Sequence, residues 1–199
     1  MVTSASTSTS GMTSNRPEMK RELIPASKLL EEPQDIALDL ASSQIFISDF
    51  GANAKILVAN LDGSGLKTLV ESKILWPSSL AIDYPNSRLY WTDLKVRSID
   101  SVQLDGQKRR LIRKFHPKEG KPNKIDVFES SVYFSTYQHN RLMKMDKFGL
   151  DQNISVIADD VIRITDLVIM HETKWSTKWK PTKTVSIMYT SDLQESPQE

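Results

Sequence analysis

Cysteine is absent from the 199 residues of the chain. That absence excludes disulfide frameworks, zinc sites built on thiolates and cysteine nucleophiles. An excess of charge of one sign is also lacking, because 26 basic residues stand against 25 acidic ones. A net charge of +1 gives no overall attraction for a phosphate backbone, so we expect no nucleic-acid partner.

Long apolar runs are missing as well. No run approaches the roughly 18 residues that a membrane-spanning helix needs. Residues 1–14 contain nine serines and threonines and no apolar stretch of the kind found in a secretory signal peptide. We therefore expect residues 1–18 to be a disordered tail. As printed, the chain is expected neither to enter the secretory pathway nor to anchor itself in a membrane.

A repeat runs through the middle of the chain. Pro33 and Pro77 are 44 residues apart, and Asp49 and Asp93 are separated by the same 44 residues. A weaker third copy begins at Pro122. A period of about 40–45 residues is typical of a four-stranded propeller blade.

The local pattern within each repeat predicts strands. Short runs rich in β-branched and aromatic residues are bounded by turn residues, and no stretch keeps a helical period. In the second repeat, four strands are expected around Leu80–Asp83, Arg88–Asp93, Ile99–Leu104 and Arg109–Arg113. The sequence thus predicts an all-β fold with repeats at about 33–75, 76–118 and 119–160, a closing strand at 164–171 and a divergent tail at 173–199.

One motif carries a resemblance. Tyr90-Trp91-Thr92-Asp93 follows Trp76-Pro77 and precedes Leu104-Asp105-Gly106. This order resembles the class B repeat of the low-density lipoprotein receptor family, best its receptor-related members, over about residues 19–172. The resemblance implies a partial six-bladed β-propeller of about three and a half blades, each of four antiparallel strands. Because stretches between Val127 and His171 are similar to the last blade of such domains, we expect the C-terminal half of one propeller, without the family's cysteine-rich neighbour module.

The resemblance also assigns structural roles. In the family, the motif aspartate accepts backbone hydrogen bonds between blades. Tyr90 and Trp91 are neighbours on one strand, so their side chains are expected to pack on opposite faces. The residues predicted to be structural are Tyr90, Trp91, Thr92, Asp93, Asp49, Asp62, Gly63, Asp105 and Gly106.

Two aromatic residues are predicted to contact a ligand. Trp76 precedes the proline between two blades, and Phe50 follows a motif aspartate. Aromatics at these positions can lie on the ligand-binding face of receptor-related propellers, and large, stiff side chains at loop ends suit binding hot spots. Ser78 is the third predicted ligand-binding residue, at a position where the family often has an asparagine that contacts the ligand. The alternative for both aromatics is that they seal the blade tops.

No catalytic or metal-binding constellation is recognised. His116, His139 and His171 are scattered and lack partners at the spacing of a metal site or catalytic triad. No catalytic residue, metal ligand or cofactor is therefore predicted, and the histidines are expected on the surface. Asn153 opens a glycosylation sequon, which matters only if the chain reaches the lumen. Lys174–Lys183, with two tryptophans, is expected to be a solvated tail.

The resemblance implies a function of recognition. The expected function is a ligand-binding propeller of an endocytic receptor-related protein, extracellular or endosomal, with protein ligands and no enzymatic activity. Membrane attachment would come only through other parts of a parent receptor. A Wnt co-receptor-type propeller, a calcium-dependent propeller hydrolase and a truncated product without independent function stay open as alternatives. Open blade edges would favour self-association.

Overall fold

The computed structural model describes residues 29–159, 161, 164–171 and 174, and the backbone of 186–191. The predicted tail 1–18 and most of 173–199 lie outside the described residues. Two 3-10 turns, η1 (Tyr84–Asn86) and η2 (Pro117–Glu119), accompany the strands. The strands are β1 (Pro33–Asp39), β2 (Gln44–Asp49), β3 (Lys55–Asn60), β4 (Lys67–Val70), β5 (Pro77–Asp83), β6 (Arg88–Asp93), β7 (Ser98–Gln103), β8 (Arg110–Lys114), β9 (Pro122–Phe128), β10 (Ser131–Thr136), β11 (Leu142–Asp146), β12 (Ser155–Ala158), β13 (Ile164–Met170) and β14 (Ser186–Ser191).

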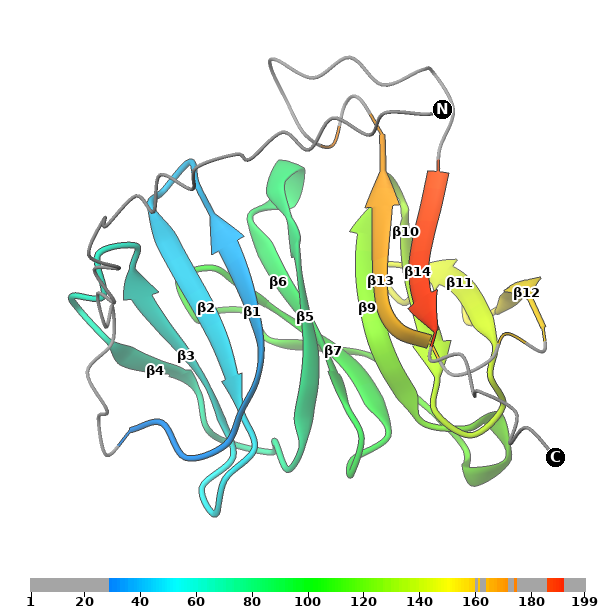
Figure 1. Ribbon diagram of the computed structural model, residues 1–199, viewed down its shortest axis with the longest axis horizontal. Helices are drawn as coiled ribbons and strands as arrows, with labels where there is room; N and C mark the ends of the chain where they lie inside the picture. Colours follow the sequence, from blue (N-terminus) through cyan, green and yellow to red (C-terminus); the bar gives the residue numbers. More distant parts are fainter. Residues whose placement is uncertain (1–28, 160, 162–163, 172–173, 175–185, 192–199) are drawn as a thin grey trace, which may run out of the picture.

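The strands form three four-stranded antiparallel sheets, each made of four consecutive strands, and a fourth sheet of β13 and β14 (Figure 1). Tight turns join the third and fourth strands of the first two sheets. Gly63 and Gly106 lie in these turns with φ of 86° and 88°, a conformation that glycine adopts without steric cost. The predicted all-β class is confirmed, and so is the order of four short strands per repeat.

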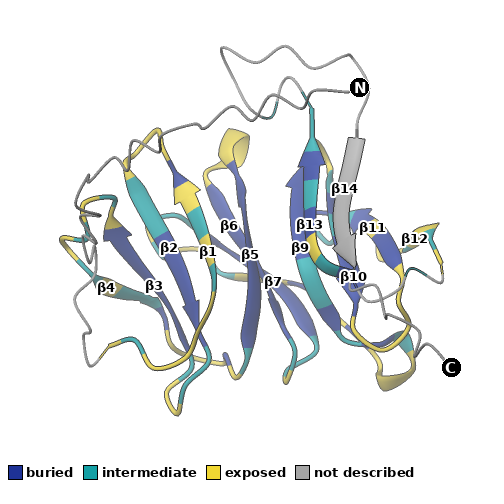
Figure 2. Cartoon of the chain, viewed as in Figure 1, coloured by how far each residue is buried: buried dark blue, intermediate teal, exposed yellow. Residues whose placement is uncertain are grey.

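The sheets are arranged as blades around a common axis. The first strands β1, β5, β9 and β13 contact one another in that order and follow one another across Figure 1. Neighbouring sheets therefore pack face to face, and their facing side chains form two large apolar clusters between the first three sheets and a smaller one between the third sheet and β13. Figure 2 shows β5, β6 and β7 almost wholly buried and β9 largely buried, with more exposure on β1, β4 and β12.

Tyr90 and Trp91 supply large side chains to both clusters. Trp91 is 0% exposed and packs between the first and second blades, in the cluster that contains Phe46. Tyr90 is 1% exposed and packs between the second and third blades, in the cluster that contains Phe134. The alternation of side chains along β6 thus lets one dipeptide join three blades.

Because the hydroxyl of Tyr90 is buried, we expect the free energy of unfolding to fall as the pH rises in the alkaline range. Burial, with a smaller contribution from the nearby Asp83 carboxylate, raises the pKa of Tyr90 to about 12. A raised pKa means that the protonated phenol is favoured in the folded state, so its contribution is complete below about pH 10 and is lost between about pH 10 and 12. Urea unfolding at pH 9 to 11.5 should show a steeper loss of stability for the wild type than for Tyr90→Phe. Equal slopes would contradict this assignment.

The fourth sheet extends the repeat beyond the point where the sequence pattern stops. The repeat pattern ends at Thr173, within the segment expected to be a divergent tail, yet β14 pairs with β13. The register break between Ile164 and Asp166 matches the break between Pro33 and Asp35 in the first sheet. The β13–β14 pair therefore corresponds to the first two strands of a blade, and β14 occupies the place of the motif strand.

Candidate ligand-binding face

A buried carboxylate organises the end of the second blade. Asp93 ends β6 and is 1% exposed. Its Oδ2 atom accepts the N–H groups of Leu75 at 2.8 Å and Trp76 at 3.1 Å. Its Oδ1 atom accepts the N–H groups of Lys95 at 3.0 Å and Val96 at 2.8 Å. One carboxylate thus fixes both the connection between blades and the β6–β7 turn.

Asp49 performs a similar task in the first blade. Its carboxylate accepts the N–H groups of Glu31 at 3.0 Å and Glu32 at 2.6 Å, and Lys55 Nζ lies 3.3 Å from Oδ2. The third blade has Thr136 at this position, and its buried Oγ1 atom has no hydrogen-bond partner within the described residues. Charged acceptors therefore hold these strand ends in the first two blades but not in the third.

The two predicted ligand-contacting aromatics meet at these strand ends. The rings of Phe50, after β2, and Trp76, before β5, stack with centroids 4.4 Å apart and planes at 21°. Backbone hydrogen bonds fix both residues, because Phe50 donates to Glu32 O at 2.9 Å and Leu94 donates to Trp76 O at 3.0 Å. Both side chains are partly exposed. The stack is therefore a rigid aromatic surface that spans two blades.

Ser78 lies deeper than the aromatics. Its side chain is buried, and its hydroxyl donates to Asn123 Oδ1 at 3.3 Å. Asn123 follows Pro122 as Ser78 follows Pro77, so the two residues hold the same position in consecutive blades. Asn123 was not predicted as a site residue. The sequence does contain a signal for it, because it directly follows the proline of the third repeat.

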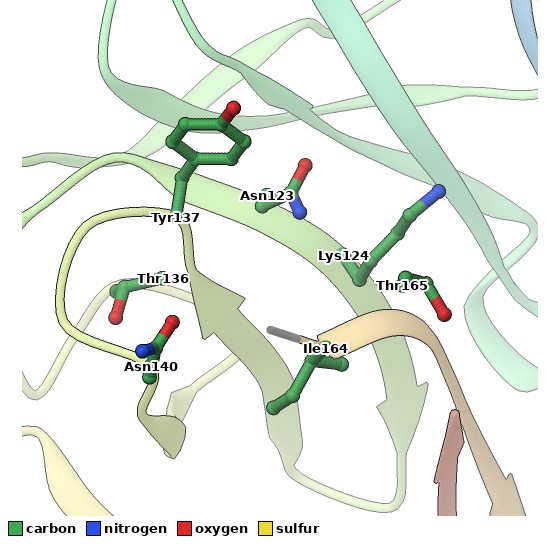
Figure 3. Close-up of a pocket in the computed structure, with 7 residues that line it drawn as sticks. All are labelled: Asn123, Lys124, Thr136, Tyr137, Asn140, Ile164 and Thr165. Atoms are coloured by element: carbon green, nitrogen blue, oxygen red, sulfur yellow. The ribbon is translucent and has the colours of Figure 1, made fainter. Parts of the chain in front are cut away.

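A cavity of about 190 Å³ continues this surface over the third blade (Figure 3). Tyr137 stands at its rim, is 57% exposed and occupies the position after Thr136 that Phe50 occupies after Asp49. The residues that line the cavity are Asn123, Lys124, Thr136, Tyr137, Asn140, Ile164 and Thr165. We name the surface formed by Phe50, Trp76, Ser78, Asn123 and Tyr137 the aromatic face.

The other predicted residues lie away from the aromatic face. The Asp62-Gly63 and Asp105-Gly106 turns lie at the opposite ends of the strands. Asn153 is exposed in the β11–β12 connection, where its N–H donates to Asp151 Oδ1 at 2.8 Å.

The three histidines stay apart. His116 and His139 are exposed. The His116 side chain caps η2 by accepting the Lys118 N–H at 3.3 Å. The ring of His171 packs on Phe128 with centroids 4.8 Å apart. No shared site is formed by these residues.

Carboxylates beside the axis serve as acceptors between blades. Asp35 Oδ2 accepts the Ser79 hydroxyl and the Leu80 N–H, each at 2.9 Å. Asp126 Oδ2 accepts the Ile169 N–H at 2.6 Å. Within the part of the chain that the structure describes, no three histidine or carboxylate side chains gather as a metal site would require.

The family model for the low-density lipoprotein receptor repeat class B matches residues 43–84 and 87–113. The chain carries class B repeats. These two matches cover most of the first two blades, including the Phe50–Trp76 stack, so the resemblance stated from the sequence is confirmed. No helix among the described residues is long and apolar enough to cross a membrane.

The relatives of these class B repeats are receptors. A vitellogenin receptor of Solenopsis invicta is 37% identical over 127 residues, which are 63% of this chain and 7% of the receptor. A human low-density lipoprotein receptor-related protein 5-like protein is 29% identical over 135 residues, which are 67% of this chain and 52% of that protein. The chain thus spans less than two thirds of the length of either relative. The class B repeats and these relatives together support a receptor-type propeller.

A solved structure supports the fold of the class B repeats. The match is to a chain in a nidogen–laminin complex, with a TM-score of 0.60, 19% identity, and coverage of 68% of this chain and 51% of that one. At this identity the likeness concerns the fold alone. It confirms the predicted β-propeller architecture.

Proposed function

We propose that this propeller recognises an extracellular protein ligand through the aromatic face, as part of a lipoprotein-receptor-type endocytic receptor. The stacked Phe50–Trp76 pair is the observation that carries the proposal. Two side chains from different blades form one partly exposed surface there. Buried aspartates hold the backbone on either side of it.

The physical properties of the aromatic face favour protein recognition. Binding energy in protein interfaces concentrates in a few large aromatic anchors, and rigid anchors lose little conformational entropy on binding. Trp76 adds an indole Nε1–H that is buried and has no hydrogen-bond partner in the described part of the chain. Asn123, Tyr137 and the adjacent cavity supply polar groups beside the aromatic pair.

The Trp76→Ala variant tests this proposal. Vitellogenin is the probe, because a vitellogenin receptor is 37% identical. Loss of a central aromatic anchor should weaken binding by about 2 kcal/mol or more, which is about 30-fold. Surface plasmon resonance with the full chain measures the affinity.

A control separates binding from stability. Leu150 is exposed at the opposite end of the blades, so Leu150→Ala should leave the affinity within about twofold. Trp76→Phe keeps an aromatic ring against Phe50 and should recover part of the affinity. Equal affinities of the wild type and Trp76→Ala, with both variants folded, would overturn the proposal.

A Wnt co-receptor-type role is the second candidate. The similarity to a receptor-related protein 5-like protein supports it, at 29% identity. The same affinity series with a purified Wnt protein distinguishes the two roles. Binding of that protein through Trp76, without binding of vitellogenin, would favour the second candidate.

A further inference from the structure

The near-neutral charge of the chain conceals a strongly basic segment. Residues 108–124 contain eight lysines and arginines and one acidic residue, Glu119. The remainder of the chain carries 18 basic against 24 acidic residues. Positive charge is therefore concentrated on β8, the outermost strand of the second blade, and on the η2 loop that follows it.

Two arginines of this segment form contacts within the protein. Arg109 pairs with Asp100 at 3.0 Å, and its guanidinium lies 4.9 Å from the ring centre of Trp91. Arg113 pairs with Glu119 and donates to Gln152 O at 2.6 Å. These two side chains have structural tasks and are not available to a partner.

Four other basic residues of the segment face solvent. Lys108, Arg110, Lys114 and Lys118 are exposed, and none of them forms an ion pair with a residue that the structure describes. Arg110 and Lys114 are four positions apart on β8, which is about 13 Å along a strand. We name these four residues the basic edge.

The blade architecture does not require this charge. Arg113, Val70 and Ala158 hold the same register position on the outermost strands of the three blades. The next residue is Lys114 in the second blade, but Glu71 in the first and Asp159 in the third. The same strand end is thus acidic in two blades and basic in one, so the basic edge is a particular property of the second blade.

We propose that the basic edge binds a sulfated polysaccharide, as a second surface separate from the aromatic face. The proposal rests on the proposed function only in placing the chain outside the cell. A linear polyanion matches basic side chains distributed along a strand, and release of its counterions favours binding.

Other anionic partners fit the basic edge less well. A peptide added to the edge of β8 would meet the β11–β12 connection, where Gln152 Nε2 donates to Ile112 O at 3.4 Å. Single-stranded nucleic acid needs exposed aromatic rings for stacking, whereas Phe115 is buried. A membrane surface needs an apolar face, and β8 exposes only Leu111 as a large apolar residue.

Heparin binding by the full chain tests the proposal. The test variant is Arg110→Gln/Lys114→Gln/Lys118→Gln, whose side chains form no hydrogen bond or ion pair with the residues that the structure describes. It should bind heparin at least about tenfold more weakly than the wild type, and the slope of log affinity against log salt should fall by about three. Isothermal titration calorimetry at several salt concentrations measures both quantities.

The matched control removes the same charge elsewhere. Lys67→Gln/Lys73→Gln/Lys144→Gln replaces three exposed lysines outside the basic edge and should keep the heparin affinity within about twofold. Chemically desulfated heparin should bind the wild type at least about tenfold more weakly. Equal losses in the two triple variants would overturn the proposal. So would equal or tighter binding of polyglutamate or a single-stranded oligonucleotide. Unchanged vitellogenin binding by the test variant would show that the two surfaces are independent.

Discussion

Replacing Asp93 with alanine should lower the free energy of unfolding by about 3 to 5 kcal/mol. The carboxylate is buried and accepts four backbone N–H groups, two from the connection before β5 and two from the β6–β7 turn. Alanine leaves these four part-buried donors without their common acceptor. Urea unfolding followed by tryptophan fluorescence measures the loss.

An aspartate in an exposed turn provides the control. Asp105 accepts the Gln107 N–H at 2.8 Å but lies at the surface, so Asp105→Asn should cost less than about 1 kcal/mol. Asp93→Asn keeps the size of the side chain and should cost more than Asp105→Asn. A loss below about 1 kcal/mol for Asp93→Ala would show that the carboxylate does not hold the blade ends.

Removing the charge of Lys147 should lower the free energy of unfolding by about as much as Asp93→Ala does. Its Nζ atom lies 2.7 Å from Asp83 Oδ2, and the two side chains are 4% and 2% exposed. The pair joins the third blade to the second. Lys147→Met would leave the Asp83 carboxylate buried without a paired cation, at a cost of about 3 to 5 kcal/mol.

A double-mutant cycle isolates the contribution of this pair. Because Asp83→Asn/Lys147→Met removes both charges, it should be more stable than Lys147→Met alone. The coupling energy is expected to be about 1 to 3 kcal/mol. Lys144→Met, on the exposed side of neighbouring β11, should change stability by less than about 0.5 kcal/mol. Strict additivity of the two substitutions at 83 and 147 would contradict the ion-pair interpretation.

The parts of the fold that could be predicted are those that depend on residues close together in the sequence. The four strands of the second blade follow from short runs rich in β-branched and aromatic residues and from turns such as Asp105-Gly106, which are features of neighbouring residues. The strand β14 could not be found in this way. Fifteen residues separate β13 from β14, whereas four separate β5 from β6, so the repeat spacing is lost. Pairing with the edge of β13 brings β14 into the register of the motif strand.

The candidate site was partly predictable for a similar reason. Phe50 and Trp76 hold recognisable positions beside repeat motifs, but their stacking depends on how two blades pack. Asn123 lies in the weakest copy of the repeat, and its hydrogen bond with Ser78 and its place beside Tyr137 in the cavity depend on how the blades pack. The basic edge was not predicted, because the net charge of the whole chain sums a basic segment and an acidic remainder and is therefore close to zero.

Hydrogen–deuterium exchange of the full chain with and without vitellogenin tests the central claim most directly. Ligand binding at the aromatic face should slow exchange at the strand ends that build this face and leave the opposite ends unchanged. Protection is expected in residues 50–54, 74–79, 121–124 and 137–141, and no change in 61–66 and 104–108. Protection confined to 61–66 and 104–108, or no protection at a ligand concentration that saturates binding, would contradict the claim that this propeller recognises its ligand through the aromatic face.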